Sequence, residues 1–326
     1  MRNVLNSIVK KSEQDIANAS KSITNSVAKS LTAMETQINE LTNEVKTKLD
    51  VLSPLVLTDK YLAFVALEDG LMVSLTNTCE YSLDGYTWHT LYSGPTPAIN
   101  TGQYIWFRGN IVPTESKGIG TFYLSKKCSV KGNIMSMLYG DNSTGQQLMQ
   151  PNAFRKLFYD RHTLIDASQL KLPDTTLADN CYSSMFAYCT ALVNAPVLPS
   201  TTLADSCYSS MFANCRTLVN APELPATVLA EECYDWMFRD CVSLVNAPEL
   251  PATTLVEGCY VRMFTDCTNL SYVKAMFIDL PEIYGDYINY WLDDVATEGT
   301  FVKNAAATWD TTAIIPEGWT VETATA

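Results

Sequence analysis

The feature that most constrains the fold is a 26-residue repeat in the second half of the chain. Leu-Pro pairs begin at residues 172, 198, 224 and 250, and Met-Phe pairs begin at residues 185, 211, 237 and 263. Two columns of cysteines keep the same spacing: Cys181, Cys207, Cys233, Cys259 and Cys189, Cys215, Cys241, Cys267. A period of this length is typical of stacked units, none of which buries its apolar face alone. The sequence therefore predicts a repeat array within residues 146–326.

The pattern inside one repeat predicts its local structure. Leu177, Cys181, Met185 and Cys189 are four residues apart, which favours a short helix with one apolar face. The positions that differ between repeats are then expected to face solvent. A short strand is predicted over Leu192–Ala195, which Pro196 ends.

The ends of the array differ from its middle, as capping units do. Residues 158–167 repeat part of the unit, with Arg161 in place of a cysteine and Asp166 in place of an asparagine. After Leu270 the pattern decays. Four large aromatic residues are expected to cover the last open repeat: Trp291, Phe301, Trp309 and Trp319.

The first 53 residues predict a long helical stem. Neither glycine nor proline occurs before Pro54. Apolar residues recur mostly at alternating spacings of three and four, which indicates the seam of a coiled coil. The predicted interface residues are Ile16, Ile23, Val27, Leu31, Met34, Ile38, Leu41, Val45, Leu49 and Leu52.

So narrow a seam has little to bury against its own chain, so we expect copies of the chain to associate through it. The mixture of Ile, Val, Leu and Met on both seam positions favours a trimer over a dimer. The alternative is a single amphipathic helix that lies on its own domain.

Residues 54–145 predict a small antiparallel β-sandwich or barrel. Short β-prone runs cover 61–66, 71–75, 104–108 and 121–124, and Gly, Asn, Asp and Pro separate them. A tight turn is predicted over Ser82–Trp88, with Trp88 packed inward. The expected fold class is thus α+β and multidomain, with a helical stem, a β region and a capped repeat array.

Composition excludes several classes of function. The chain has 22 Lys and Arg against 35 Asp and Glu, a net charge of −13, which disfavours binding to nucleic-acid phosphates. No apolar run is long enough to cross a bilayer, and the first thirty residues lack the pattern of a secretory signal. We therefore expect synthesis in a cytoplasm and no membrane insertion.

The candidate site residues belong to the repeats. Exposed and variable positions suggest a recognition surface that includes Tyr188, Trp236, Arg239 and Arg262, residue types common in interfaces, although an ordinary solvent-facing surface explains them equally well. A column of carboxylates is a weak candidate for a divalent-cation site. Its simpler role is to stabilise helix N-termini. The column consists of Asp179, Asp205, Glu231 and Glu257.

The cysteines and histidines give no sign of cofactor chemistry. No cysteine pair has the Cys-x-x-Cys spacing of a zinc site, so buried free thiols are favoured over disulfides or metal clusters. With only two histidines and no phosphate-binding glycine loop, we expect no catalytic site and no cofactor.

The repeats resemble the BspA-type, or Treponema-type, leucine-rich repeat. The matching order is Met185-Phe186, Cys189, Leu192 and then Leu198-Pro199, and segments 299–303 and 315–321 resemble the closing part of such proteins. The start of the chain resembles the attachment stem of phage fibres, as in the crAss-like phages that infect Bacteroides.

The resemblance implies a leucine-rich-repeat solenoid in a non-enzymatic virion structural protein, either a head fibre or a tail fibre. The N-terminal segment would contact capsid or tail proteins, and the repeats would contact bacterial surface glycan or protein. Such a protein would be exposed on the virion. The alternatives are a bacterial cell-surface adhesin with the same repeats and a polysaccharide depolymerase.

Overall fold

The computed structural model describes residues 2–92, 94–148, 150–173, 176–280 and 285–325, with the backbone alone for residues 3–4, 46–55, 285 and 313. The chain forms two compact units, Met1–Leu55 and Val56–Ala326.

The first unit is a continuous helix. Helix α1 (Arg2–Lys60) has 59 residues, which confirms the predicted long helix. Its chain continues past Pro54, and its last residues belong to the second unit. Thr24, Thr32, Thr36 and Thr42 each donate a hydroxyl hydrogen bond to the carbonyl four residues earlier. Every described side chain from residue 5 to residue 45 is exposed.

The second unit begins with a six-stranded sheet in the order β4-β3-β5-β1-β7-β8. The strands are β1 (Leu62–Ala66), β3 (Cys79–Ser82), β4 (His89–Leu91), β5 (Tyr104–Arg108), β7 (Cys128–Asn133) and β8 (Leu164–Lys171). Within residues 54–145 every described strand pair is antiparallel, as predicted, whereas β8, which lies beyond those bounds, pairs with β7 in parallel and makes the sheet mixed. Strand β8 comes from the cap that precedes the repeats, so the β region and the repeats share this sheet.

A second pair of strands, β2 (Val73–Leu75) and β6 (Phe122–Leu124), lies beside the same core. The short helices α2 (Ser136–Tyr139) and η1 (Gly140–Asn142) follow β7. Phe64 and Phe122 contact each other, and each of them also contacts Phe107 and Phe158, at 5.0–6.0 Å between ring centroids. These four rings join the sheet to the first cap, and one hydrophobic core continues from there into the repeats.

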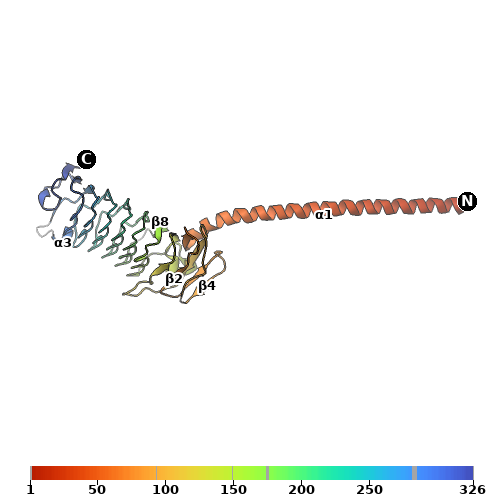
Figure 1. Cartoon of the computed structure of the whole chain (residues 1–326), viewed down its shortest axis with the longest axis horizontal. Helices are drawn as coiled ribbons and strands as arrows, with labels where there is room; N and C mark the ends of the chain where they lie inside the picture. Colours follow the sequence, from red (N-terminus) through yellow and green to blue (C-terminus); the bar gives the residue numbers. More distant parts are fainter. Residues whose placement is uncertain (1, 93, 149, 174–175, 281–284, 326) are drawn as a thin grey trace. The chain divides into compact units, whose positions relative to one another are not determined.

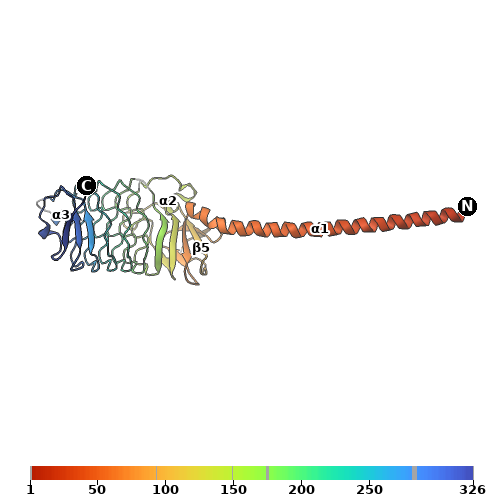
Figure 2. The ribbon, with the colours of Figure 1, turned by 90° about the horizontal axis from the view of Figure 1, so that it is seen from above.

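The repeats stack in register, with the 26-residue spacing preserved in space. Tyrosine rings form one buried column and phenylalanine rings form the next. In each column, the rings of consecutive repeats stack on one another. Consecutive ring centroids are 5.7–6.0 Å apart in the column Tyr182, Tyr208, Tyr234, Tyr260 and 5.2–5.7 Å apart in the column Phe158, Phe186, Phe212, Phe238, Phe264. Figures 1 and 2 show the repeats as successive turns of chain between β8 and α3.

A single parallel bridge per repeat replaces the predicted strand over Leu192–Ala195. The bridges join Asn194 to Asn220 and Asn220 to Asn246, and they continue to Asp166 at one end and Tyr272 at the other. These bridges place Asp166 next to Asn194, the first asparagine of the column. The cap over residues 158–167 therefore lies in register with the repeats, as predicted.

The predicted short helix is wrong. In the described residues of each repeat, the apolar residues that are four apart lie on a chain of tight turns. The N–H groups of Cys181, Ser183 and Met185 donate to the carbonyl three residues earlier. The N–H groups of Tyr182 and Ser184, which alternate with them, donate to the next repeat instead. A helix would keep all these hydrogen bonds inside one repeat, whereas the turns use half of them to join neighbours.

Every second turn places a residue in the left-handed region. Asn180, Ser184 and Tyr188 have φ of 54°, 54° and 63°, and the pattern recurs in the following repeats. Turns of type II require such a φ at their third residue. The third of these positions holds Asp or Asn in five of its six occurrences, residues that tolerate this conformation best: Asp160, Asn214, Asp240, Asp266 and Asp294.

The C-terminal end carries a parallel three-stranded sheet and two short helices. Strand β10 (Thr300–Lys303) lies between β9 (Tyr272–Ala275) and β11 (Thr320–Thr323). The helices are α3 (Gly285–Ile288) and η2 (Thr311–Ala313). The predicted aromatic cap is confirmed: Trp291, Phe301 and Trp319 are buried, and Trp309 packs at 4.9 Å from Phe277.

Candidate recognition surfaces

The apolar seam of α1 is exposed. Ile16, Ile23, Val27, Leu31, Met34, Ile38, Leu41 and Val45 are each 58–67% exposed. The side chains of Leu49 and Leu52, which belong to the same predicted interface, lie outside the described residues. Single exposed apolar residues are common on proteins. Eight of them at coiled-coil spacing along one helix are instead typical of a surface that another chain covers.

Three of the four predicted recognition residues lie together. The Arg239 guanidinium is 4.4 Å from the centroid of the Trp236 ring, and the Arg262 guanidinium is 4.9 Å from the same ring. Arg262 also lies 5.2 Å from the ring centroid of Tyr290. We call Trp236, Arg239, Arg262 and Tyr290 the cation–π ladder, because such contacts attract through the ring quadrupole.

Tyr188 is not part of the ladder. It belongs to another column of positive-φ residues, and it contacts Tyr159 at 5.4 Å between ring centroids. At 41% exposure it remains accessible to solvent. The structure thus separates Tyr188 from the other three predicted residues.

The ladder occupies strained backbone positions. Trp236, Arg262 and Tyr290 have φ of 57°, 51° and 54°. A bulky side chain in this region costs about 1–2 kcal/mol, and strain of this kind clusters at functional sites. Serines hold the same position in the two preceding repeats, Ser184 and Ser210. Because every repeat has a positive φ at this position whatever its side chain, the strain belongs to the turn, and Trp236 and Arg262 are half-buried there.

Asp235 is a site residue that the sequence interpretation missed. Its Oδ1 atom is buried without a hydrogen-bond partner. Burial and the neighbouring charge of Glu232 raise the pKa of its carboxyl to about 7, and the Arg262 guanidinium acts in the opposite direction. A signal was present: Asp235 stands where other repeats have Ser183, Ser209 and Val261.

The cysteine columns are inert packing groups. All ten cysteines are buried free thiols. In the second column, each Sγ donates to a phenylalanine carbonyl at 3.0–3.2 Å. Burial raises the pKa of Cys215 and Cys241 well above the usual value of a thiol, so the thiolate needed for nucleophilic or metal chemistry is suppressed.

The predicted role of the carboxylate column as a helix N-terminal charge is wrong, because the repeats form turns at this position. Backbone carbonyls of Asp179, Asp205, Glu231 and Glu257 accept hydrogen bonds from the adjacent repeat instead. The Asp205 carboxylate also accepts from the backbone N–H of Glu231 at 3.2 Å. Within the described part of the chain, no group of three or more His, Cys, Asp or Glu residues is placed to hold a metal ion.

His162 makes contacts that its sequence neighbours do not suggest. Its Nδ1 atom lies 2.9 Å from the Thr190 hydroxyl, and its Nε2 atom lies 3.1 Å from the Asp160 carboxylate. His162 and Asp160 are 59% and 49% exposed. Water competes for both groups at such exposure, so we interpret the contacts as surface hydrogen bonds between stacked segments.

The predicted tight turn before β4 is confirmed. The Asp84 carboxylate accepts hydrogen bonds from the N–H groups of Tyr86 and Thr87, and these hold the pKa of Asp84 well below its usual range. Trp88 packs edge-on to Tyr61 at 4.7 Å, and the Arg108 guanidinium covers its ring at 4.2 Å. The tryptophan is therefore a packing residue.

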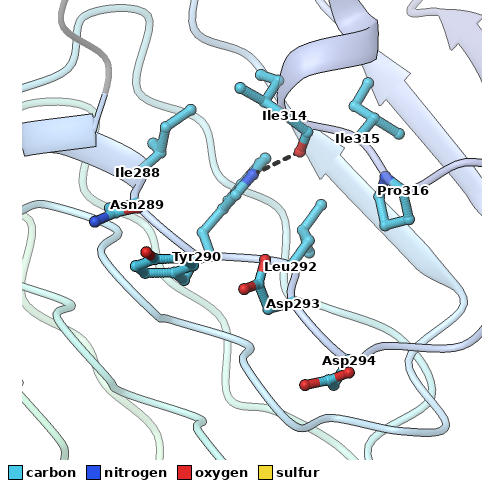
Figure 3. Close-up of a pocket in the computed structure, with 10 residues that line it drawn as sticks. Ile288, Asn289, Tyr290, Leu292, Asp293, Asp294, Ile314, Ile315 and Pro316 are labelled. Atoms are coloured by element: carbon cyan, nitrogen blue, oxygen red, sulfur yellow. Dashed lines mark hydrogen bonds between the residues drawn. The ribbon is translucent and has the colours of Figure 1, made fainter.

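A pocket of about 480 Å³ lies at the C-terminal end of the repeats. Figure 3 shows Tyr290 and Asp293 on one side of it and Ile315 and Pro316 on the other. The sequence interpretation did not predict this pocket. Its two sides come from segments that are twenty or more residues apart in sequence, beyond the last regular repeat.

Comparisons with known proteins give no match: no protein-family profile fits the chain, and searches of curated proteins and of solved structures find nothing similar. Among the described residues, no helix combines the length and apolarity that crossing a membrane requires.

Proposed function

We propose that the protein is a non-enzymatic fibre protein of a bacteriophage particle, a head fibre or a tail fibre. In this proposal α1 assembles three copies of the chain as a coiled coil and attaches them to capsid or tail proteins. The repeat domain, a leucine-rich-repeat solenoid of the BspA type, then contacts glycan or protein on the bacterial surface.

The observation that supports this proposal most is the exposed seam of α1. Hiding a fully exposed Leu, Ile, Val or Met side chain contributes about 1.5–3 kcal/mol. The eight described seam side chains are about 60% exposed, so covering each one contributes roughly 1–2 kcal/mol in every chain. Other copies of α1 offer the same seam with the same spacing, which makes self-association the simplest way to cover it.

The repeat domain suits the display of a binding surface. Stacked rings and hydrogen bonds between repeats give it a rigid core, and its positive-φ positions present variable side chains. Weak binding by each copy is sufficient, because several copies on one particle raise the effective concentration. Attachment to a virion follows from the resemblance of the helical stem to phage fibres. A bacterial surface adhesin would use the same stem and repeats on a cell.

The proposal is tested first by the mass of the protein in solution. Sedimentation of the full chain at about 10 µM should give three times the 36.1 kDa of one chain. Replacing Leu31 and Ile38 together by Glu places charges in the seam and should yield monomers, because burying an unpaired carboxylate costs several kcal/mol. A monomeric wild-type chain would refute the stem.

A matched control carries the same charges on the other side of the helix. Ala33→Glu with Thr36→Glu should leave the mass unchanged, since both positions face away from the seam. Labelling with an antibody on intact phage particles then distinguishes a head fibre from a tail fibre. Release of reducing sugar from host polysaccharide would favour the depolymerase alternative and contradict the non-enzymatic proposal.

A further inference from the structure

The C-terminal pocket has the size and construction of a small-molecule site. Its volume of about 480 Å³ falls within the roughly 300–1,000 Å³ that such sites occupy. The Trp291 Nε1 group donates a 2.9 Å hydrogen bond to the carbonyl of Ile314, drawn as a dashed line in Figure 3. This bond ties together the two segments that line the pocket. Trp291, Ile314 and Ile315 are 2–8% exposed, so the wall that they form is packed and rigid.

The opposite side of the pocket is acidic and aromatic. Tyr290 is 50% exposed although Arg262 stacks on its ring. Asp293 and Asp294 follow it in sequence, and both are exposed. The residues that line the pocket include these two carboxylates and neither Lys nor Arg. A ligand in the pocket therefore meets net negative charge beside an accessible aromatic ring.

Neighbouring carboxylates repel the carboxylate of Asp293, so a positive group beside it would be favourable. Burial raises the pKa of Asp293, the nearby carboxylate of Asp294 raises it further, and Asp266 adds to the effect. Arg262 opposes these effects, but its guanidinium lies between the rings of Trp236 and Tyr290. A cation that entered the pocket would relieve the repulsion between the two aspartates.

We propose that this pocket binds an amino sugar through its ammonium group. Asp293 and Asp294 pair with the ammonium group, and Tyr290 stacks on the apolar face of the pyranose ring. Carboxylates form strong charge-assisted hydrogen bonds with ammonium groups, and aromatic rings attract cations through the ring quadrupole. The apolar wall of Ile315 and Pro316 contacts the other face of the sugar. This inference rests on the proposed adhesive function and names the ligand class that the repeat domain recognises.

The size of the pocket favours a sugar over a lysine side chain. A lysine places one ammonium group on a narrow alkyl chain, which would leave most of the volume unfilled. A pyranose fills more of the space, and its remaining hydroxyls reach the Asn289 amide that also lines the pocket. An amine displayed on a bacterial protein, such as a lysine side chain, is the competing source of an ammonium group.

Ligand-observed NMR titrations of the full chain at about pH 6.5 test the proposal. The probes are glucosamine, glucose and Nα-acetyl-lysine amide. Glucosamine should bind at least tenfold more tightly than glucose, which has a hydroxyl in place of the amine. Asp293→Asn should remove this preference, and Tyr290→Ala should weaken both sugars. Glu223→Gln removes an equal charge on the surface outside the pocket and should change nothing.

The possible outcomes test the pocket proposal separately from the fibre proposal. Equal binding of glucosamine and glucose, or a preference that survives Asp293→Asn, overturns the ammonium site. Tighter binding of the lysine amide than of glucosamine overturns the sugar in favour of a protein ligand. In each of these cases, sedimentation of the same Asp293→Asn variant measures its oligomeric state, which tests the coiled-coil stem and does not depend on the pocket. Failure of the pocket proposal is therefore distinguishable from failure of the fibre proposal.

Discussion

The buried position of Asp235 in the repeats can be tested by the pH dependence of the free energy of unfolding. Its carboxyl is half-buried, one of its oxygens has no hydrogen-bond partner, and its pKa rises to about 7, chiefly because of burial. In the unfolded chain the carboxyl returns to about 3.8. Between these values the folded protein holds a proton that the unfolded chain has released. The folded state therefore loses stability as pH rises from about 4 to about 7.

The size of the effect follows from the two pKa values. A difference of about 3 pH units corresponds to about 4 kcal/mol at 1.36 kcal/mol per unit. Water reaches part of the side chain, so we expect about half of this, roughly 2 kcal/mol. Asp235→Asn and Asp235→Ser remove the titrating group. Serine is the residue that the two preceding repeats hold at this position, Ser183 and Ser209.

Urea unfolding at about pH 4.5 and pH 8, at one protein concentration, measures the difference. Both variants should match the wild type in free energy of unfolding near pH 4.5 and exceed it by about 2 kcal/mol near pH 8. The control Asp179→Asn changes an exposed carboxylate and should stay within about 0.5 kcal/mol of the wild type at both pH values. Variants less stable than the wild type near pH 8 would refute the reasoning.

Further predictions concern the interior of the repeats. Phe212→Ala removes a fully buried ring between two stacked neighbours and should cost about 3–5 kcal/mol in urea unfolding, whereas Val228→Ala at a 74% exposed position should cost less than about 0.5 kcal/mol. Gly258→Ala places a Cβ atom 2.7 Å from Cγ of Glu232 at a φ of 67° and should cost about 1–2 kcal/mol by the same measurement; Glu232→Ala in the same chain should recover part of that loss. A thiol reagent should modify the ten buried cysteines only after denaturation, and rapid labelling of the native protein would contradict their burial.

The repeat period was sufficient to predict contacts within the array. Residues 26 apart stack on one another, so the columns of Cys, Tyr, Met and Phe could be identified as core from their spacing. The same rule places Trp236 beside Arg262, which stand at equivalent positions of consecutive repeats. It places Tyr188 elsewhere, in a different column, although exposure and residue type had grouped it with the other three.

The local backbone of the repeats could not be predicted in this way. Apolar residues four apart fit a helix and also fit a chain of tight turns. The choice depends on where the backbone N–H groups find partners, and half of them find carbonyls in the next repeat. These are long-range hydrogen bonds, so a pattern within one repeat does not reveal them.

The sequence by itself determined the long helix, the stacked repeats and the aromatic residues that close the array, because periodic spacing fixes which side chains share a face. Tertiary structure alone decided the parallel pairing of β7 with β8, the burial of Asp235 and the pocket beside Tyr290. The pocket lies where the period breaks, so its two sides meet only through the fold of the cap. A repeat determines its contacts with an identical neighbour, and contacts between unlike segments depend on the whole chain.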